Sequence, residues 1–173
     1  AAHESLGRAI HFHHSVSHPV IVAPTHVVDT PDRRQLTYPW YDGVVLNHAT
    51  IKGSDRSGLD RFHQRHPAEI LTAIDAIVLI DLDEYRPGPF IVDGARLPGS
   101  TRYMAPEEFV QGGTIDERTT VFHLGRTAGQ LLGEPNLSAG RRDVIETATR
   151  TDPTDRYPSV ARMAAAWRSV AMV

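Results

Sequence analysis

Two carboxylates stand at the end of an apolar run and could hold a divalent metal ion. The run AIVLIDLDEY covers residues 76–85 and is typical of a short buried strand that ends in acidic residues. Mg²⁺ binds proteins through one or two carboxylates and keeps its other positions for water or phosphate oxygens. The pattern makes Asp81 a candidate metal ligand, and Asp83 either joins the metal shell or solvates the loop.

Histidines offer a second, weaker metal-binding pattern. His14 and His18 are at i, i+4, a spacing at which two imidazoles on one helix can hold Zn²⁺. Pro19 breaks that geometry, and no carboxylate lies within a turn of the pair. We therefore expect surface histidines. The chain has no cysteine, so thiolate catalysis and cysteine-ligated zinc are excluded.

Composition limits the partners and the compartment. A chain of 173 residues, with 40% hydrophobic residues and a net charge of -3, fits a compact soluble unit without the basic footprint of a nucleic-acid-binding protein. No apolar run has the length of a membrane span, and the N-terminus lacks a secretory signal, so we expect a cytoplasmic protein. Lys52 is the sole lysine, and its turn-rich context predicts a solvated loop residue.

The elements that must position these residues begin with a helix and a hairpin. Residues 3–16 predict a helix, because apolar positions fall on one face; the face comprises Leu6, Ile10, His13 and Val16. Residues 20–28 and 34–41 predict two strands, joined by the turn DTPD. A loop-rich stretch then leads to a helix that opens at Pro67.

The second half predicts three helices. The first spans residues 119–133 and ends at Gly133; its apolar stripe comprises Val121, Leu124, Ala128, Leu131 and Leu132. Two more helices are predicted over residues 141–150 and 158–170. The last of them carries Val160, Met163, Trp167 and Val170 in helical register.

Six short motifs follow one another in a recognisable order. They are SHPVIV, LTYPWYDG, LIDLD, GSTRYMAPE, TTVFHLG and TDPTDRYPS. Each is weak alone, but together they make the chain resemble a eukaryotic-type bacterial Ser/Thr protein kinase, from about residue 4 to residue 170 and without the first strands. The resemblance implies an α+β, protein-kinase-like fold, with a partial N-lobe and hinge over residues 1–43 and a mainly helical C-lobe over residues 44–173.

The resemblance also implies a nucleotide site. Tyr38 occupies the gatekeeper position, and the hinge backbone around Trp40 and Tyr41 would bind the adenine of ATP. Asp81 stands in the place of the metal-binding Asp of Asp-Phe-Gly, whose Mg²⁺ bridges the nucleotide phosphates. Asp83 replaces the glycine of that motif. The implied cofactors are ATP and Mg²⁺.

The implied activation segment contains Ser100 and Thr101, which would shape the peptide site. Its last motif, Ala-Pro-Glu, ends at Glu107. The resemblance pairs this glutamate with Arg156, and a planar guanidinium is suited to a partly buried bidentate bond with a carboxylate. We therefore expect an ion pair that ties the segment to the helical lobe.

Parts of the kinase template are missing. A Gly-rich loop, a strand lysine paired with a helix glutamate, and a catalytic loop with its Asp and Asn are not visible. Ala9 stands at the glutamate position, and Thr120 stands where an Asp normally braces the catalytic loop. Residues 67–81 are too few to hold a full helix, a strand and the catalytic loop.

Two explanations of these gaps compete. The chain is a degenerate pseudokinase, or its residues join parts of a longer chain across omitted segments. We favour the second, because a real deletion would uncover buried surfaces in a folded lobe. The expected function is then phosphoryl transfer from MgATP to Ser or Thr of protein substrates, and the alternative is a nucleotide- or protein-binding scaffold. A small-molecule kinase is disfavoured by the Ala-Pro-Glu segment and by Arg156.

Overall fold

The computed structural model describes residues 2–19, 21–40, 86–134 and 137–170. The chain divides into two compact units, Ala1–Arg86 and Pro87–Val173. The described residues form a mixed α+β structure with four α-helices and two small antiparallel sheets. No helix in this part of the chain is long and apolar enough to cross a membrane. The expected boundary after residue 43, the helix expected from Pro67 and the strand ending at Asp81 all lie outside the described residues.

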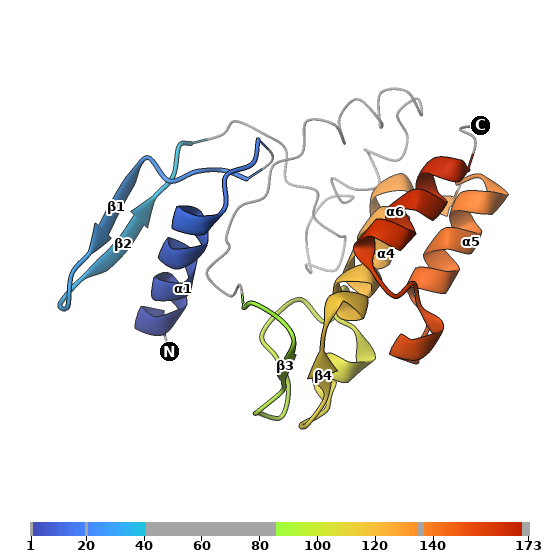
Figure 1. Cartoon of the computed structure of the whole chain (residues 1–173), viewed down its shortest axis with the longest axis horizontal. Helices are drawn as coiled ribbons and strands as arrows, with labels where there is room; N and C mark the ends of the chain where they lie inside the picture. Colours follow the sequence, from blue (N-terminus) through green and yellow to red (C-terminus); the bar gives the residue numbers. More distant parts are fainter. Residues whose placement is uncertain (1, 20, 41–85, 135–136, 171–173) are drawn as a thin grey trace, which may run out of the picture. The chain divides into compact units, whose positions relative to one another are not determined.

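In the first unit a helix lies beside a hairpin (Figure 1). The helix is α1 (Ala2–Ser15), and the hairpin consists of β1 (His26–Asp29) and β2 (Arg34–Thr37). Val27 stands opposite Leu36 in the antiparallel register. The turn is closed by the backbone N–H of Thr30, which donates to the carbonyl oxygen of Arg33 at 2.9 Å. The expected order of helix and hairpin is therefore confirmed.

Two details of this unit differ from the expectation. The buried apolar face of α1 consists of Ala9, Ile10 and Phe12, whereas Val16 follows the end of the helix and is 36% exposed. Both strands are shorter than expected, because Pro24 and Pro39 have no N–H to donate to a strand ladder. Regular pairing is therefore confined to the residues between these two prolines.

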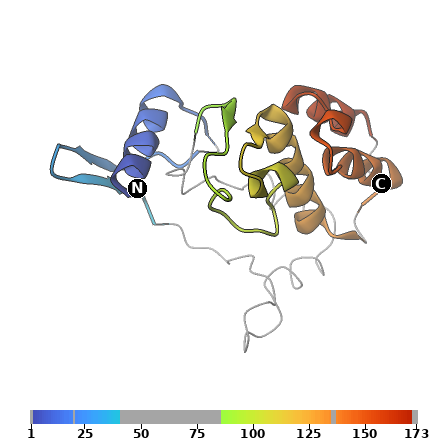
Figure 2. The same ribbon diagram turned by 90° about the horizontal axis from the view of Figure 1, so that it is seen from below.

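The second unit surrounds a central helix (Figure 2, gold). This helix is α4 (Glu117–Leu132). The other elements are β3 (Phe90–Ile91), β4 (Thr114–Ile115), the 3-10 helices η1 (Pro106–Phe109) and η3 (Pro153–Asp155), α5 (Ala139–Ala148) and α6 (Val160–Ser169). Asp116 caps the start of α4 by accepting the N–H of Arg118 at 2.8 Å. Gly133 ends it with φ 69°, as expected.

The core of this unit lies between α4, α5 and α6. Its buried residues are Val121, Val144, Ala148 and Met163. The expected apolar positions of α6 are confirmed, because Val160, Trp167 and Val170 pack around Met163 and its neighbours.

The expected stripe of α4 is only partly right. Val121 and Leu132 are buried, but Leu124 is 41% exposed. The helix turns Gly125 toward α5, where an added Cβ would lie 2.8 Å from the Cβ of Ala148. Position 124 is about 100° away around the helix, so the Leu124 side chain points away from this contact with α5.

Candidate functional site

The candidate site is built on residues 99–109, which we call the anchored segment. It starts at Gly99, whose φ of 143° favours glycine. A turn follows, in which the N–H of Tyr103 donates to the carbonyl oxygen of Ser100 at 3.0 Å. Ser100 and Thr101 are exposed, whereas Met104 and Ala105 are buried. The segment thus presents a hydroxyl-bearing turn while its second half enters the core.

The expected ion pair between Glu107 and Arg156 is present. Arg156 Nη1 donates to Glu107 Oε1 at 2.7 Å, and Nη2 donates to Oε2 at 2.9 Å. The two parallel bonds make the contact bidentate. The side chain of Arg156 is 0% exposed and that of Glu107 is 9% exposed. The pair is therefore largely shielded from water, at the end of the anchored segment.

Arg156 also binds three backbone carbonyls. Its Nε donates to Arg150 at 2.7 Å, its Nη2 to Thr151 at 3.0 Å and its Nη1 to Arg118 at 3.2 Å. All five N–H donors of the guanidinium thus have acceptors. The guanidinium carbon also lies 4.8 Å from the centre of the Phe122 ring. One side chain therefore joins the anchored segment to α4 and to the loop after α5.

One face of α4 makes a second set of contacts with the segment. The hydroxyl of Thr119 donates to Glu107 Oε1 at 2.8 Å. One turn further along, His123 Nε2 lies 2.5 Å from Glu108 Oε2. The same oxygen of Glu108 accepts the backbone N–H of Ala105 at 2.6 Å. Adjacent glutamates of η1 are therefore held by adjacent turns of α4.

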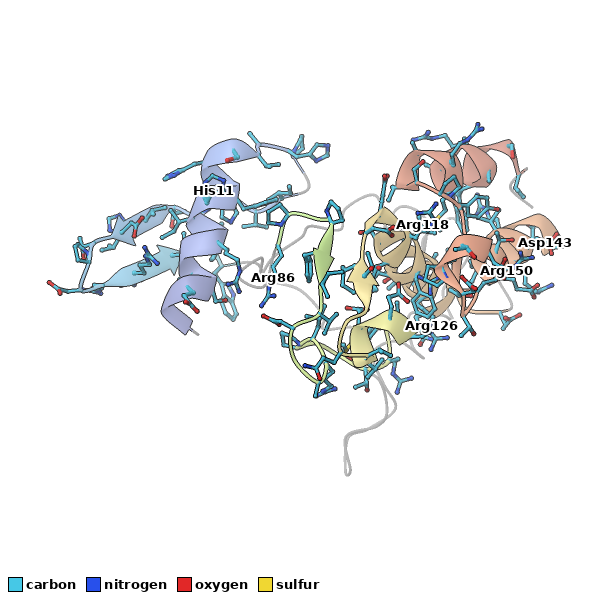
Figure 3. The ribbon with its side chains drawn as sticks, turned by 60° about the horizontal axis from the view of Figure 1, so that its bottom comes forward. His11, Arg86, Arg118, Arg126, Asp143 and Arg150 are labelled. Carbon is cyan, nitrogen blue, oxygen red and sulfur yellow. The ribbon has the colours of Figure 1, made fainter. Side chains whose placement is uncertain are left out.

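A third contact lies further along the same helix. Arg126 donates from Nη2 to the carbonyl oxygen of Arg102 at 3.1 Å. Its Nε donates to the same oxygen at 3.3 Å. Figure 3 shows Arg118 and Arg126 at different heights on α4. The anchored segment is therefore bound to α4 through Arg102 in its first half and through Glu107 and Glu108 near its end.

The surroundings of Glu107 favour its ionised form. Burial by itself raises the pKa of this carboxyl group. The hydrogen bonds from Arg156 and Thr119, together with the positive charge of Arg156, outweigh burial and hold the pKa of Glu107 below its ordinary value of 4.5. The carboxylate therefore stays charged in the folded protein at a pH where a free glutamate would begin to protonate.

Acid should destabilise the second unit through this group. A folded-state pKa below the unfolded value gives stability that is fully present above about pH 4.5 and is lost as the pH falls through the depressed folded pKa. We expect the urea midpoint, followed by circular dichroism, to fall less steeply below about pH 4.5 for Glu107→Gln than for the unchanged chain. Glu134→Gln is the control, because its carboxylate is 77% exposed. Equal acid sensitivity of Glu107→Gln and the unchanged chain would contradict this prediction.

The residues expected at the nucleotide and metal site are only partly described. The hydroxyl of Tyr38 is 2.9 Å from His13 Nε2, so it links β2's end to α1. Burial lowers the pKa of His13, as does the charge of His14. Trp40 is 89% exposed. Tyr41, Asp81 and Asp83 lie outside the described residues, so their roles stay predictions.

Sequence reasoning missed several residues of the site. Thr119, Glu108 and His123 were not among the candidates. Their neighbour Thr120, which stands where an Asp normally braces the catalytic loop of the kinase template, is exposed. A signal was present in the sequence, because Thr119 and His123 are polar residues at i, i+4 and so share a helix face. Their partners come from another element, and the pattern of one helix does not name them.

Comparisons with known proteins add no family assignment: the chain matches no protein-family model and no curated protein. The kinase resemblance thus depends on the ordered motifs and on the pair they predicted. Residues 67–81 lie outside the described residues, so both explanations of the missing catalytic loop stay predictions.

Proposed function

We propose that the chain is a kinase-like binding module of the pseudokinase type, in which the anchored segment serves as a docking surface for a protein partner. The observation that carries this proposal is the buried, bidentate Glu107–Arg156 pair, which holds the segment against α4. The catalytic loop of the kinase template would have to lie within residues 67–81, and that interval has no room for it. What remains of the template is suited to binding.

The contacts that hold the anchored segment against α4 support docking. A surface already held in its bound shape loses less conformational entropy when a partner binds, so more of the contact energy appears as affinity. The ties to Glu107, Glu108 and Arg102 leave the turn at Ser100 and Thr101 exposed. An extended peptide lying over this turn would find hydroxyl groups and backbone groups in fixed positions.

Weak binding of adenine nucleotide is part of the proposal. Adenine would be bound by the hinge backbone around Trp40 and Tyr41, which needs no catalytic loop. Asp81, with or without Asp83, would hold Mg²⁺ against the phosphates. These groups would give ATP a binding role without supplying a base for transfer.

Phosphoryl transfer to Ser or Thr of a protein substrate is the second candidate function. It is favoured by the combination of Asp81 in an apolar-to-acidic run with the Glu107–Arg156 pair, because both belong to the template of an active enzyme. It requires a base and a second metal ligand from residues that the motifs do not identify.

One pair of assays separates the two functions. MgATP binding is measured by calorimetry, and transfer is followed with γ-labelled ATP, using autophosphorylation and a generic basic protein as acceptors. The proposal expects nucleotide binding without transfer. Transfer that Asp81→Asn abolishes would overturn it in favour of the enzyme, because the amide loses the charge that holds the metal. Absence of binding at millimolar ATP would contradict the proposed nucleotide binding, and only the proposed protein docking would remain.

A further inference from the structure

A stripe of polar side chains on α4 faces the anchored segment. Thr119, His123 and Arg126 are at i, i+4 and i+7, so they lie one above another on the same helix face. We call them the polar stripe. Their partners all belong to the anchored segment: Glu107 for Thr119, Glu108 for His123 and the carbonyl of Arg102 for Arg126. The opposite face of α4 carries the buried Val121 and Gly125.

The middle contact has the shortest distance. His123 Nε2 and Glu108 Oε2 are 2.5 Å apart, and the side chain of Glu108 is 7% exposed. The hydrogen bond has Nε2 as its donor in the tautomer that carries the proton on that nitrogen. The imidazole side chain is 41% exposed. The contact therefore joins a buried carboxyl group to an imidazole at the edge of the core.

Glu108 forms hydrogen bonds with the backbone of Ala105 and Leu97. Its carboxylate accepts the N–H of Ala105 at 2.6 Å, and its own N–H donates to the carbonyl of Ala105 at 3.1 Å. Its carbonyl accepts the N–H of Leu97 at 2.9 Å. A shift of the Glu108 side chain would therefore loosen the start of η1 as well as the contact with α4.

We propose that His123 is a positioning residue, whose imidazole fixes the Glu108 carboxylate where that carboxylate holds the N–H of Ala105. The Glu107–Arg156 pair secures the end of the segment, and the His123–Glu108 contact secures the start of η1. The effect of this contact on partner docking rests on the proposed function. The contact itself does not, because it is measured without any ligand.

The test uses amide hydrogen exchange in the full chain, measured by NMR at Ala105 and, for reference, at Val144 in α5. In His123→Ala the exchange of Ala105 should rise by about tenfold or more relative to Val144, since the Glu108 side chain loses its hydrogen bond to the imidazole. His123→Gln should restore protection to within about threefold, because the amide can donate to the same oxygen. Thr120→Ala is the matched control, as this neighbour on α4 is exposed.

The outcomes decide the proposal. Unchanged exchange of Ala105 in His123→Ala overturns it, and so does a His123→Gln variant as fast as His123→Ala, which would indicate a role in packing alone. If His123→Ala fails to fold, the same comparison is made between His123→Gln, Glu108→Gln and the double variant. The effects of Gln at the two positions should then be non-additive. Additive effects overturn the proposal, and neither result depends on whether the chain binds nucleotide.

Discussion

Replacing Arg156 by alanine should destabilise the Pro87–Val173 unit by about 3–5 kcal/mol, the usual cost of breaking a buried ion pair. The variant leaves the Glu107 carboxylate, 9% exposed, with Thr119 as its remaining side-chain donor in the contacts described. It also removes the donors that bind the carbonyls of Arg118, Arg150 and Thr151. Urea unfolding followed by circular dichroism measures the change.

Two further variants test the cause of this loss. Arg156→Lys keeps the charge but not the fork of donors, so it should fall between the unchanged chain and Arg156→Ala. Arg142→Ala removes an exposed pair, in which Arg142 and Glu134 are 42% and 77% exposed, and should cost less than about 1 kcal/mol. A loss for Arg156→Ala no larger than that for Arg142→Ala would show that the buried pair contributes little.

Gly125→Ala should destabilise the same unit by about 1–3 kcal/mol through overpacking. An added Cβ would lie 2.8 Å from the Cβ of Ala148 and 2.9 Å from Thr149 Cγ2, both closer than side-chain atoms normally approach. Alanine is favoured over glycine inside a helix by about 1 kcal/mol, so the loss must exceed that gain to be seen. Thermal and urea unfolding both report it.

Gly129→Ala is the matched control on the same helix. Its added Cβ would meet Ile145 Cγ2 at 3.6 Å, an ordinary contact distance. Here the gain in helix propensity should prevail, and the variant should be unchanged or more stable by up to about 1 kcal/mol. The same sign for both glycines would mean that α5 does not approach α4 at Gly125 as described.

Much of the local structure could be predicted from the residues. The helix, hairpin and three later helices follow from apolar spacing and from turn residues, and Gly133 ends α4 as expected. The strands came out shorter because Pro24 and Pro39 outweigh the apolar run around them. The choice of buried face on α4 was not predictable, since Leu124 and Gly125 differ by one position and only the approach of α5 selects between them.

In the candidate site, too, some contacts could be predicted from the sequence and others could not. By itself the sequence determined the elements and, through its ordered motifs, the partnership of Glu107 with Arg156, because those motifs hold both residues in a known context. Only the tertiary structure decided that Thr119, His123 and Arg126 bind the anchored segment. Helical spacing places these side chains on one face of α4. Which backbone and carboxylate oxygens that face meets depends on how a separate element folds against it.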